Sequence, residues 1–168
     1  MADVITIGLS EILVGTASPE GTMPADGELK KIGKTYKDSC KFSQDTSDVT
    51  EHYEEGHATP EVRKKTKKAP TLTFSLMTPD VQTLVDYVGG ANIGDSSNPK
   101  WGFDGTEVVA NKAIKVVTQQ GLDFEMPNCD IEATINGDFS ATGIFLVDFT
   151  VTPLSVATGK ALRATPKK

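Results

Sequence analysis

The sequence predicts a mostly β protein, a β-sandwich or barrel-like domain with one short α-helix and a long charged hairpin loop. Apolar and polar residues alternate with period two through most of the chain, as in strands with one buried face. One segment, residues 78–90, has helical spacing instead. The 168 residues can bury a core without disulfides or a metal, so we expect a single domain over 1–168.

The strands follow from the alternation. In TLTFSLM, Leu72, Phe74 and Leu76 share a face, and in IFLVDFTV every second residue from Phe145 to Val151 does. Further strands are expected at residues 4–9, 12–15, 31–43, 113–119, 122–126 and 129–136. Short strands in this number have the proportions of a β-sandwich or barrel.

The helix is expected at TPDVQTLVDYVGG. Its apolar stripe, at positions i, i+3, i+4 and i+7, consists of Val81, Leu84, Val85 and Val88. Thr78 can cap the first turn, Pro79 suits its first position, and Asp80 lies at the positive end of the helix dipole. Gly89 can take the left-handed conformation that ends helices, so we expect a short amphipathic helix over one side or end of the sandwich.

Charge and cysteine content exclude several classes of protein. A net charge of -6 argues against a protein whose main task is to hold nucleic acid by its phosphates. The two cysteines, Cys40 and Cys129, are far apart, which excludes a zinc cluster of paired cysteines and favours two buried free thiols. The start, MADVITIGLSEILVG, is neither basic nor long and apolar, so we expect no signal peptide or membrane anchor and a reducing cytoplasm as the compartment.

The segment 45–68 carries an acidic run followed by the basic run VRKKTKK. Opposite charges on two limbs that turn at 55–60 favour a hairpin in which they face each other across the strands. Such a hairpin has little apolar surface, so we expect it to be mobile in a free subunit and to order against a partner. A solvated loop is the alternative.

Other uses of this segment are less favoured. His52 and His57 are five residues apart, which would point them to opposite faces of one strand, and with no third histidine we expect solvated side chains, not a metal site. Ser47 and Thr50 could act as nucleophiles only with a general base held within reach, and the sequence shows no catalytic motif that supplies one. We therefore expect no enzyme activity and no cofactor. The basic run lacks the interleaved aromatic residues of a nucleic-acid patch.

The chain has a characteristic order of elements. Early strands come first, then a long charged hairpin loop, then TLTFSLM before a short helix ending in VGG, and finally a last strand, FLVDFTVTPL. This order resembles the major tail tube proteins of long-tailed phages and the related tube proteins of contractile injection systems. The likeness covers most of the chain and depends most on the phrases GLDFEMPN and FTVTPL. The five basic residues of VRKKTKK are more than the family leads us to expect.

The resemblance implies a structural virion protein of the phage tail, made in the host cytoplasm. Subunits would form hexameric rings that stack into a tube through which DNA passes without specific binding. Residues 46–68 would be the stacking loop, 1–15 and 153–168 peripheral arms, and the helix a brace on the outside. Partners would be further copies, a tape measure protein, a tail terminator and, in a contractile tail, a sheath, with no membrane span. The stacking residues would be Glu51, Tyr53, Glu54, Arg63, Lys64, Lys65, Lys67 and Lys68.

The predicted strands 122–126 and 129–136 each have an apolar face and a carboxylate face. If they pair as a hairpin through Pro127 and Asn128, their like charges oppose each other, which costs about a few tenths of a kcal/mol per pair. This unfavourable crowding of carboxylates would be useful on the wall of a channel that passes DNA, because an acidic wall repels the DNA phosphates. A solvated face with Lys112 or Lys115 as counter-charge, or a weak calcium site, are the alternatives. The four carboxylates are Asp123, Glu125, Asp130 and Glu132.

A function of another class is a monomeric β-sandwich that binds a sugar or peptide. It would present the loop 91–105 with Trp101, the only tryptophan, to the ligand. A tryptophan is more often a core or interface anchor than a ligand platform, which favours assembly.

Overall fold

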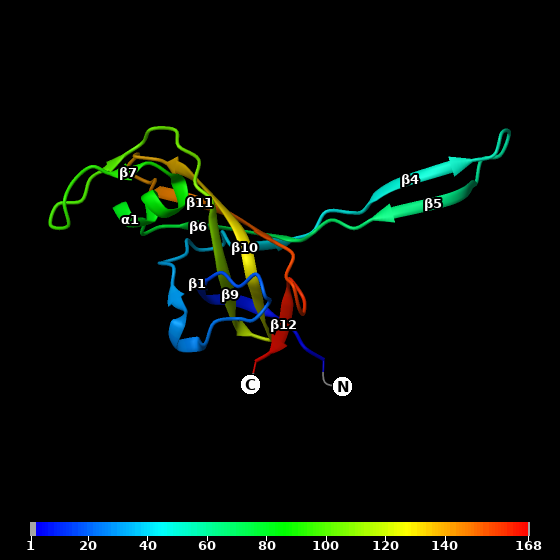
Figure 1. Ribbon diagram of the computed structural model, residues 1–168, viewed down its shortest axis with the longest axis horizontal. Coiled ribbons are helices and arrows are strands. Elements are labelled where there is room, and N and C mark those ends of the chain that lie inside the picture. The colour runs from blue at the N-terminus through cyan, green and yellow to red at the C-terminus, as the bar shows by residue number, and fades with distance from the viewer. Residues whose placement is uncertain (1–2, 168) are drawn as a thin grey trace.

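The computed structural model describes residues 3–167 and confirms the mostly β fold class (Figure 1). Eight strands form one antiparallel sheet in the order β2-β1-β9-β10-β11-β6-β3, with β12 also paired to β10. Their bounds are β1 (Ile7–Thr16), β2 (Lys30–Lys31), β3 (Lys41–Ser43), β6 (Thr71–Leu76), β9 (Ala110–Gln120), β10 (Leu122–Gly137), β11 (Phe145–Pro153) and β12 (Arg163–Pro166). No helix among the described residues is long and apolar enough to cross a bilayer.

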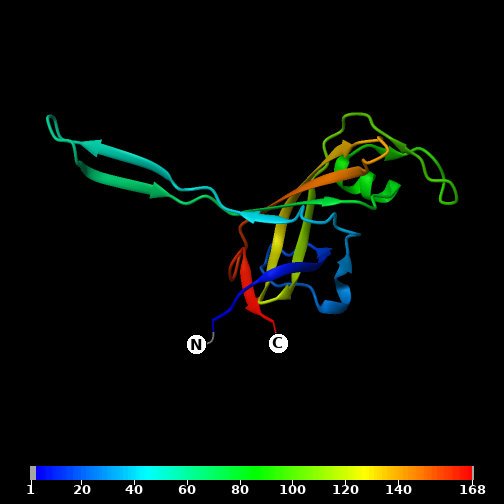
Figure 2. The ribbon, with the colours of Figure 1, turned by 180° about the vertical axis from the view of Figure 1, so that it is seen from behind.

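The segment that follows β2 connects the two ends of this sheet. Ile32 N–H donates to the carbonyl of Ile12 in β1 (3.1 Å), and Tyr36 N–H donates to the carbonyl of Ser75 in β6 (2.8 Å). A short 3-10 turn, η1 (Asp26–Glu28), precedes it. Because one segment bonds to both β1 and β6, the sheet is bent around a common core and has a β-sandwich-like form (Figure 2).

The core consists of the alternate residues that the sequence pattern selects. Leu72, Phe74 and Leu76 of β6 are buried, and so are Phe149 and Val151 of β11. The rings of Phe74 and Phe149 stack with centroids 4.9 Å apart. The fully buried Ile12 of β1 belongs to the same cluster, so both ends of the sheet contribute to one core.

Strand β10 corrects the prediction of a hairpin over 122–136. The chain does not turn at Pro127 and Asn128 but continues as one strand of 16 residues. Met126 pairs with Ile114 and Cys129 with Lys112, so β10 has one residue more than β9 between these pairs, a β-bulge. The bulge shifts the alternation by one residue and keeps both halves of the apolar pattern on the core side. It also tolerates Pro127, which has no N–H for a ladder.

Two other strand predictions are wrong in their bounds. Residues 4–9 and 12–15 were expected as two strands, but β1 is continuous, with a register shift between Leu9 and Glu11. The single strand expected over 31–43 is divided into β2 and β3. At Gly33 the backbone comes so near β6 that a Cβ would lie 2.7 Å from Leu76 Cδ1, and its φ of +148° suits glycine.

The helical segment has a different N-cap from the predicted one. It comprises α1 (Val81–Thr83) and a π-helical turn, η2 (Leu84–Val88), and ends at Gly89 as expected, with φ +110°. Asp80 caps it, because its Oδ1 accepts hydrogen bonds from Thr83 N–H and Oγ1, both 2.8 Å. The Thr78 hydroxyl instead accepts a hydrogen bond from Lys34 N–H (3.0 Å), so it joins the helix start to the segment after β2.

The helical segment packs on the core side of the sheet. The Tyr87 ring meets the Phe149 ring edge-on with centroids 5.3 Å apart, and Leu84 and Val88 also contact the core. Burial, with a smaller effect of the neighbouring Asp86 charge, raises the pKa of Tyr87 to about 12. The segment is thus anchored by an aromatic contact to β11.

Two small sheets lie outside the main one. β4 (Asp48–Tyr53) and β5 (Pro60–Thr66) form a two-stranded hairpin, and β7 (Ala91–Asn92) pairs with β8 (Trp101–Gly102) inside the expected loop 91–105. In Figure 1 the hairpin projects from the body on the side away from α1 and β7. We call residues 46–68 the arm.

The chain ends belong in part to the main sheet. Residues 7–15 lie in β1, which pairs with β9, and residues 163–166 lie in β12, which pairs with β10. Residues 1–2 and 168 of the predicted terminal arms lie outside the described residues. A role of these ends in contacts between subunits stays a prediction.

Candidate functional site: the arm and the groove

The arm has the opposed charges that the sequence predicts. Glu51 faces Arg63 across the two strands, with Arg63 Nε 2.8 Å from Glu51 Oε1, and Lys68 Nζ lies 3.0 Å from Asp48 Oδ1. A hydrogen bond from the Tyr53 hydroxyl, followed by the Arg63 charge, lowers the pKa of Glu51 and keeps it ionised. Both pairs are accessible to solvent, which screens their attraction, so they set the register of the arm more than its stability.

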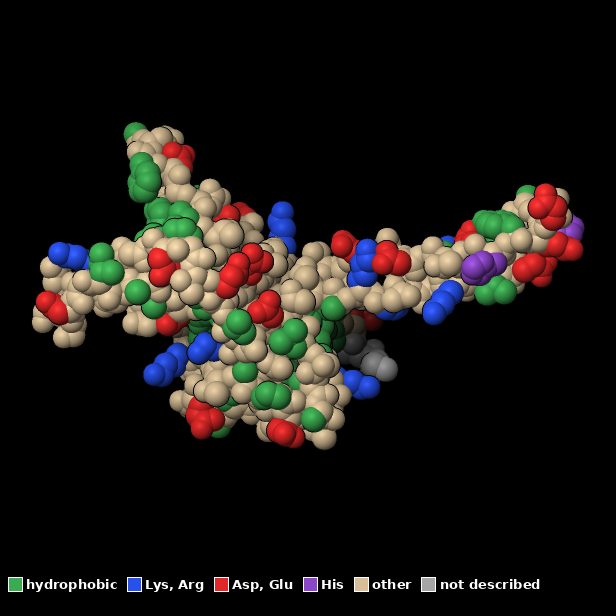
Figure 3. Space-filling view, turned by 45° about the horizontal axis from the view of Figure 1, so that its top comes forward, with side chains coloured by type: hydrophobic (Ala, Val, Ile, Leu, Met, Phe, Trp, Pro, Cys, Tyr) green, Lys and Arg blue, Asp and Glu red, His purple; other side chains and the backbone are tan. Residues whose placement is uncertain are grey.

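The arm also carries groups with no partner on their own chain. Within residues 3–167, Lys64, Lys65 and Lys67 have no carboxylate within ion-pair distance. Val49 and Val62 are exposed on its surface. Figure 3 shows this narrow, charged projection standing free of the body, with acidic side chains gathered at its tip. A two-stranded hairpin has little stability of its own in water, so these features suit contact with another molecule.

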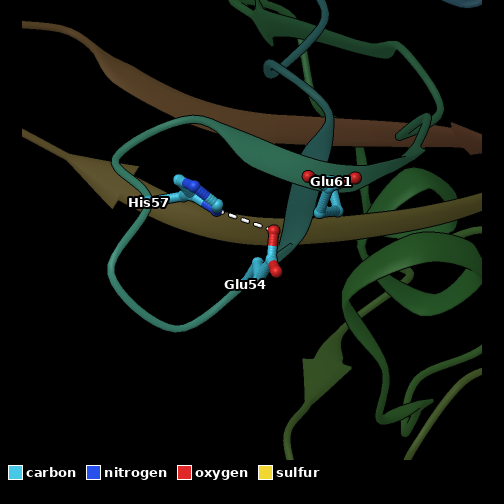
Figure 4. A group of neighbouring side chains, drawn as sticks. All are labelled: Glu54, His57 and Glu61. Carbon is cyan, nitrogen blue, oxygen red and sulfur yellow. Dashed lines mark ion pairs between the residues drawn. The ribbon is translucent and has the colours of Figure 1, made fainter.

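Glu54, His57 and Glu61 meet at the tip of the arm (Figure 4). His57 Nδ1 lies 2.7 Å from Glu54 Oε2, and the candidate ligand atoms of all three residues lie within 4.8 Å of one another. All three side chains are exposed, and His52, the other histidine, is not part of the group. A closed structural zinc site has four ligands, and no fourth His, Cys, Asp or Glu among the described residues belongs to this group. That both histidines are solvated and not metal ligands stays a prediction.

A groove of about 830 Å³ lies at the other end of the molecule. Its walls are the end of η2, residues 101–109 and residues 130–135 of β10, and we call this site the groove. Trp101 anchors one wall, because its Nε1 donates to the Gly89 carbonyl (2.7 Å) and its ring lies near that of Phe103, with centroids 5.9 Å apart. Phe103 is 65% exposed and Val109 81% exposed, so this wall presents apolar surface to solvent.

The groove follows an unpaired strand edge. β9 pairs with β10 only as far as Ala110 opposite Ile131, whereas β11 continues on the other side of β10 to Gly137. Residues 132–137 of β10 therefore have no strand partner toward the groove among the described residues. An edge of unpaired N–H and C=O groups is a template for another strand.

The bulge divides the four carboxylates of β10 into two pairs. Asp123 accepts hydrogen bonds from Thr118 N–H (2.9 Å) and Oγ1 (3.1 Å). Glu125 lies 3.8 Å from Lys115 Nζ, the counter-charge expected on the preceding strand. Asp130 and Glu132 are exposed and line the groove. The structure does not bring the four together, and among the described residues they form no metal-binding group.

Sequence reasoning missed several residues of this site. Glu107 and Val109 line the groove, but they follow the expected loop 91–105 in a stretch without periodicity, so no local pattern distinguishes them. Asp148 of β11, which lies outside the arm and the groove, was not foreseen either. It accepts hydrogen bonds from Ser75 Oγ (2.5 Å) and from the side-chain amide of Asn136 (3.0 Å), which makes it a polar link across three strands.

The two cysteines are free. Cys129 is buried in the core, and burial raises the pKa of its thiol to about 12. Cys40 is half-buried, and burial raises its pKa as well. Neither thiol has the lowered pKa that a reactive nucleophile requires.

No protein-family model matches this chain, and no curated protein matches it. The likeness to tail tube proteins therefore rests on the order of elements and on short phrases of sequence. The function has to be argued from the arm and the groove themselves.

Proposed function

We propose that this protein is the subunit of a phage tail tube, which self-assembles into stacked hexameric rings around a channel for DNA. The observation that carries the proposal is the arm. It projects from the body, its side chains are almost all exposed, and three of its lysines have no partner among the described residues. An element of this kind gains stability only through contact with another molecule.

Open strand edges support self-association. Among residues 3–167, residues 132–137 of β10 have no strand partner toward the groove, and β1 pairs with the short β2 only at Leu13 and Val14. Different edges that join between copies give a heterologous contact, which closes into a ring or continues as a filament. In a tail, the partners would include the tape measure protein, the terminator and, where the tail contracts, a sheath.

For the channel wall, Asp130 and Glu132 are the better candidates of the four carboxylates. They are exposed and have no cationic partner within the described residues, whereas Asp123 and Glu125 already have partners on β9. Free carboxylates on a channel wall would repel DNA phosphates and let the polymer slide.

Electron microscopy of the concentrated protein, combined with size-exclusion chromatography, tests the proposal. Rings or tubes are expected for the wild type. They should be lost when Lys64, Lys65, Lys67 and Lys68 are all changed to glutamate and kept when the same four are changed to arginine, which preserves the charge. A strictly monomeric wild type at high concentration would overturn the assembly function.

The groove favours a second candidate function, a monomeric binding module for a sugar or peptide. Its volume of about 830 Å³ lies in the range of small-ligand pockets, about 300–1,000 Å³. Trp101 and Phe103 would then contact the ligand. A monomeric protein whose Trp101 fluorescence changes on titration with sugars or peptides would support this function over assembly.

A further inference from the structure

The chain carries two sets of unpaired charges of opposite sign in two different places. Lys64, Lys65 and Lys67 of the arm lack carboxylate partners within residues 3–167. The groove likewise contains three carboxylates without a cationic partner in the described chain, namely Glu107, Asp130 and Glu132. Each set is a complement for the other, and charge complementarity steers association and fixes its register.

The two sites also match as strand and edge. β5 has seven residues and an open outer side, because in the part of the chain that the structure describes the arm sheet contains two strands. The unpaired edge of β10 over residues 132–137 has nearly the same length. A strand added to a sheet edge satisfies the backbone groups of both elements, and side-chain pockets then give the specificity.

The faces of the two strands agree in chemistry. Lys65 and Lys67, together with Arg63, which already pairs with Glu51, alternate onto one face of β5 and its continuation. Asp130 and Glu132 alternate on the outer face of β10, with Glu132 on the open edge and Asp130 just before it, opposite Asn111 of β9. Residues two apart on a strand are separated by about 6.6 Å, so the basic and acidic repeats have the same spacing.

The opposite face of β5 is mixed, because it carries Val62 together with Lys64 and Thr66. Val62, which is exposed in the free chain, alternates onto the opposite face of β5. Val62 on that face would meet the apolar lining of the groove, Ala133, Ile135 and the exposed Phe103, and Lys64 would meet Glu107, which lines the same groove.

From these observations we infer that the arm of one copy docks in the groove of a second copy, with β5 added to the open edge of β10. The arm leaves the body on the side away from α1 and β7, which border the groove region, so it points away from its own groove (Figures 1 and 2). Each copy therefore offers one arm and one groove, a head-to-tail contact that propagates from copy to copy. The inference rests on the proposed function and names the surface that receives the arm. If the arm docks there, Asp130 and Glu132 pair with its lysines and do not line the channel.

Charge reversal on each side tests the contact by sedimentation velocity and electron microscopy. The arm variant is Lys64→Glu, Lys65→Glu and Lys67→Glu, and the groove variant is Glu107→Lys, Asp130→Lys and Glu132→Lys. Each alone should weaken self-association at least about tenfold, because like charges then face each other in the joint. The six substitutions together, or an equimolar mixture of the two variants, should restore it. Far-ultraviolet circular dichroism checks that each variant is folded.

A cross-linking experiment gives a second readout that does not depend on charge. In a Cys40→Ser background, Lys65→Cys and Glu132→Cys on one chain should give a ladder of covalent multimers on mild oxidation. A mixture of the two single variants should give dimers only. Cys129 stays in place, because it is buried and its thiol has a raised pKa.

The outcomes separate the docking from the proposed function. If tubes form but the combined reversal does not restore assembly and no ladder appears, the arm docks elsewhere and only the docking is wrong. If the wild type never associates, both are wrong. If a sugar or peptide occupies the groove while assembly continues unchanged, the docking is again overturned.

Discussion

Replacing Phe149 with alanine should remove a large part of the stability of the fold. Phe149 is 1% exposed, stacks on Phe74 at 4.9 Å and receives the edge of Tyr87 at 5.3 Å. Burial of a phenylalanine side chain contributes about 1.5–3 kcal/mol and each aromatic pair about 0.5–1.5 kcal/mol. We therefore expect Phe149→Ala to lower the free energy of unfolding by about 3–5 kcal/mol, the range observed for such changes in cores.

Urea denaturation followed by the fluorescence of Trp101 measures this effect. The probe is suitable because the Trp101 indole bonds to the Gly89 carbonyl at the end of η2, which contacts Phe149 through Tyr87. Phe139→Ala is the matched control. Phe139 is 87% exposed although its ring stacks on that of Phe145, so its loss should cost about 0.5 kcal/mol or less. A cost below about 1 kcal/mol for Phe149→Ala, or equal costs for both variants, would refute this account of the core.

Three further predictions concern the helix and its surroundings. The pKa of Tyr87 is about 12 in the folded chain, against 10.0 when unfolded, so the free energy of unfolding should fall as pH rises from 10 to 12. Urea titrations at these pH values should show a shallower fall for Tyr87→Phe. Asp80→Ala should cost about 0.5–2 kcal/mol in thermal unfolding, whereas Asp80→Asn, which keeps a capping oxygen, should cost little. Gly90→Ala should lower the melting temperature, because φ is +90° and a Cβ would lie 2.1 Å from the Gly102 carbonyl oxygen; Gly27→Ala, with nothing within 4 Å, should leave it unchanged or raise it slightly.

The charge pattern of the arm predicted its secondary structure but not all of its side-chain contacts. Opposite charges on consecutive limbs predicted a hairpin, and the structure contains it with Glu51 opposite Arg63. The partners of the arm did not follow from the pattern. Lys68 pairs with Asp48 while Lys64, Lys65 and Lys67 have no such partner among the described residues, and this depends on the register and twist of the two strands.

The sequence predicted some residues of the groove but not that they lie together. Trp101 was selected as the only tryptophan, and Asp130 and Glu132 as part of an acidic strand face. Their meeting beside the open edge of β10 depends on where β9 stops pairing and on the route of residues 103–109. Both are set by contacts between residues far apart in the chain, which a single sequence does not record.

By itself the sequence determined the mostly β class, the faces of β6 and β11 that form the core, the helical segment that ends at Gly89 and the charged arm. These follow from period, turn residues and charge, which act over a few neighbouring residues. Only the tertiary structure decided that β10 passes Pro127 and Asn128 without turning, that Asp80 caps the helix, and that no described strand pairs with residues 132–137 of β10 on the groove side. The physical reason is that a bulge or an edge is defined by the strand alongside, and the choice of that strand depends on how the whole sheet closes around its core.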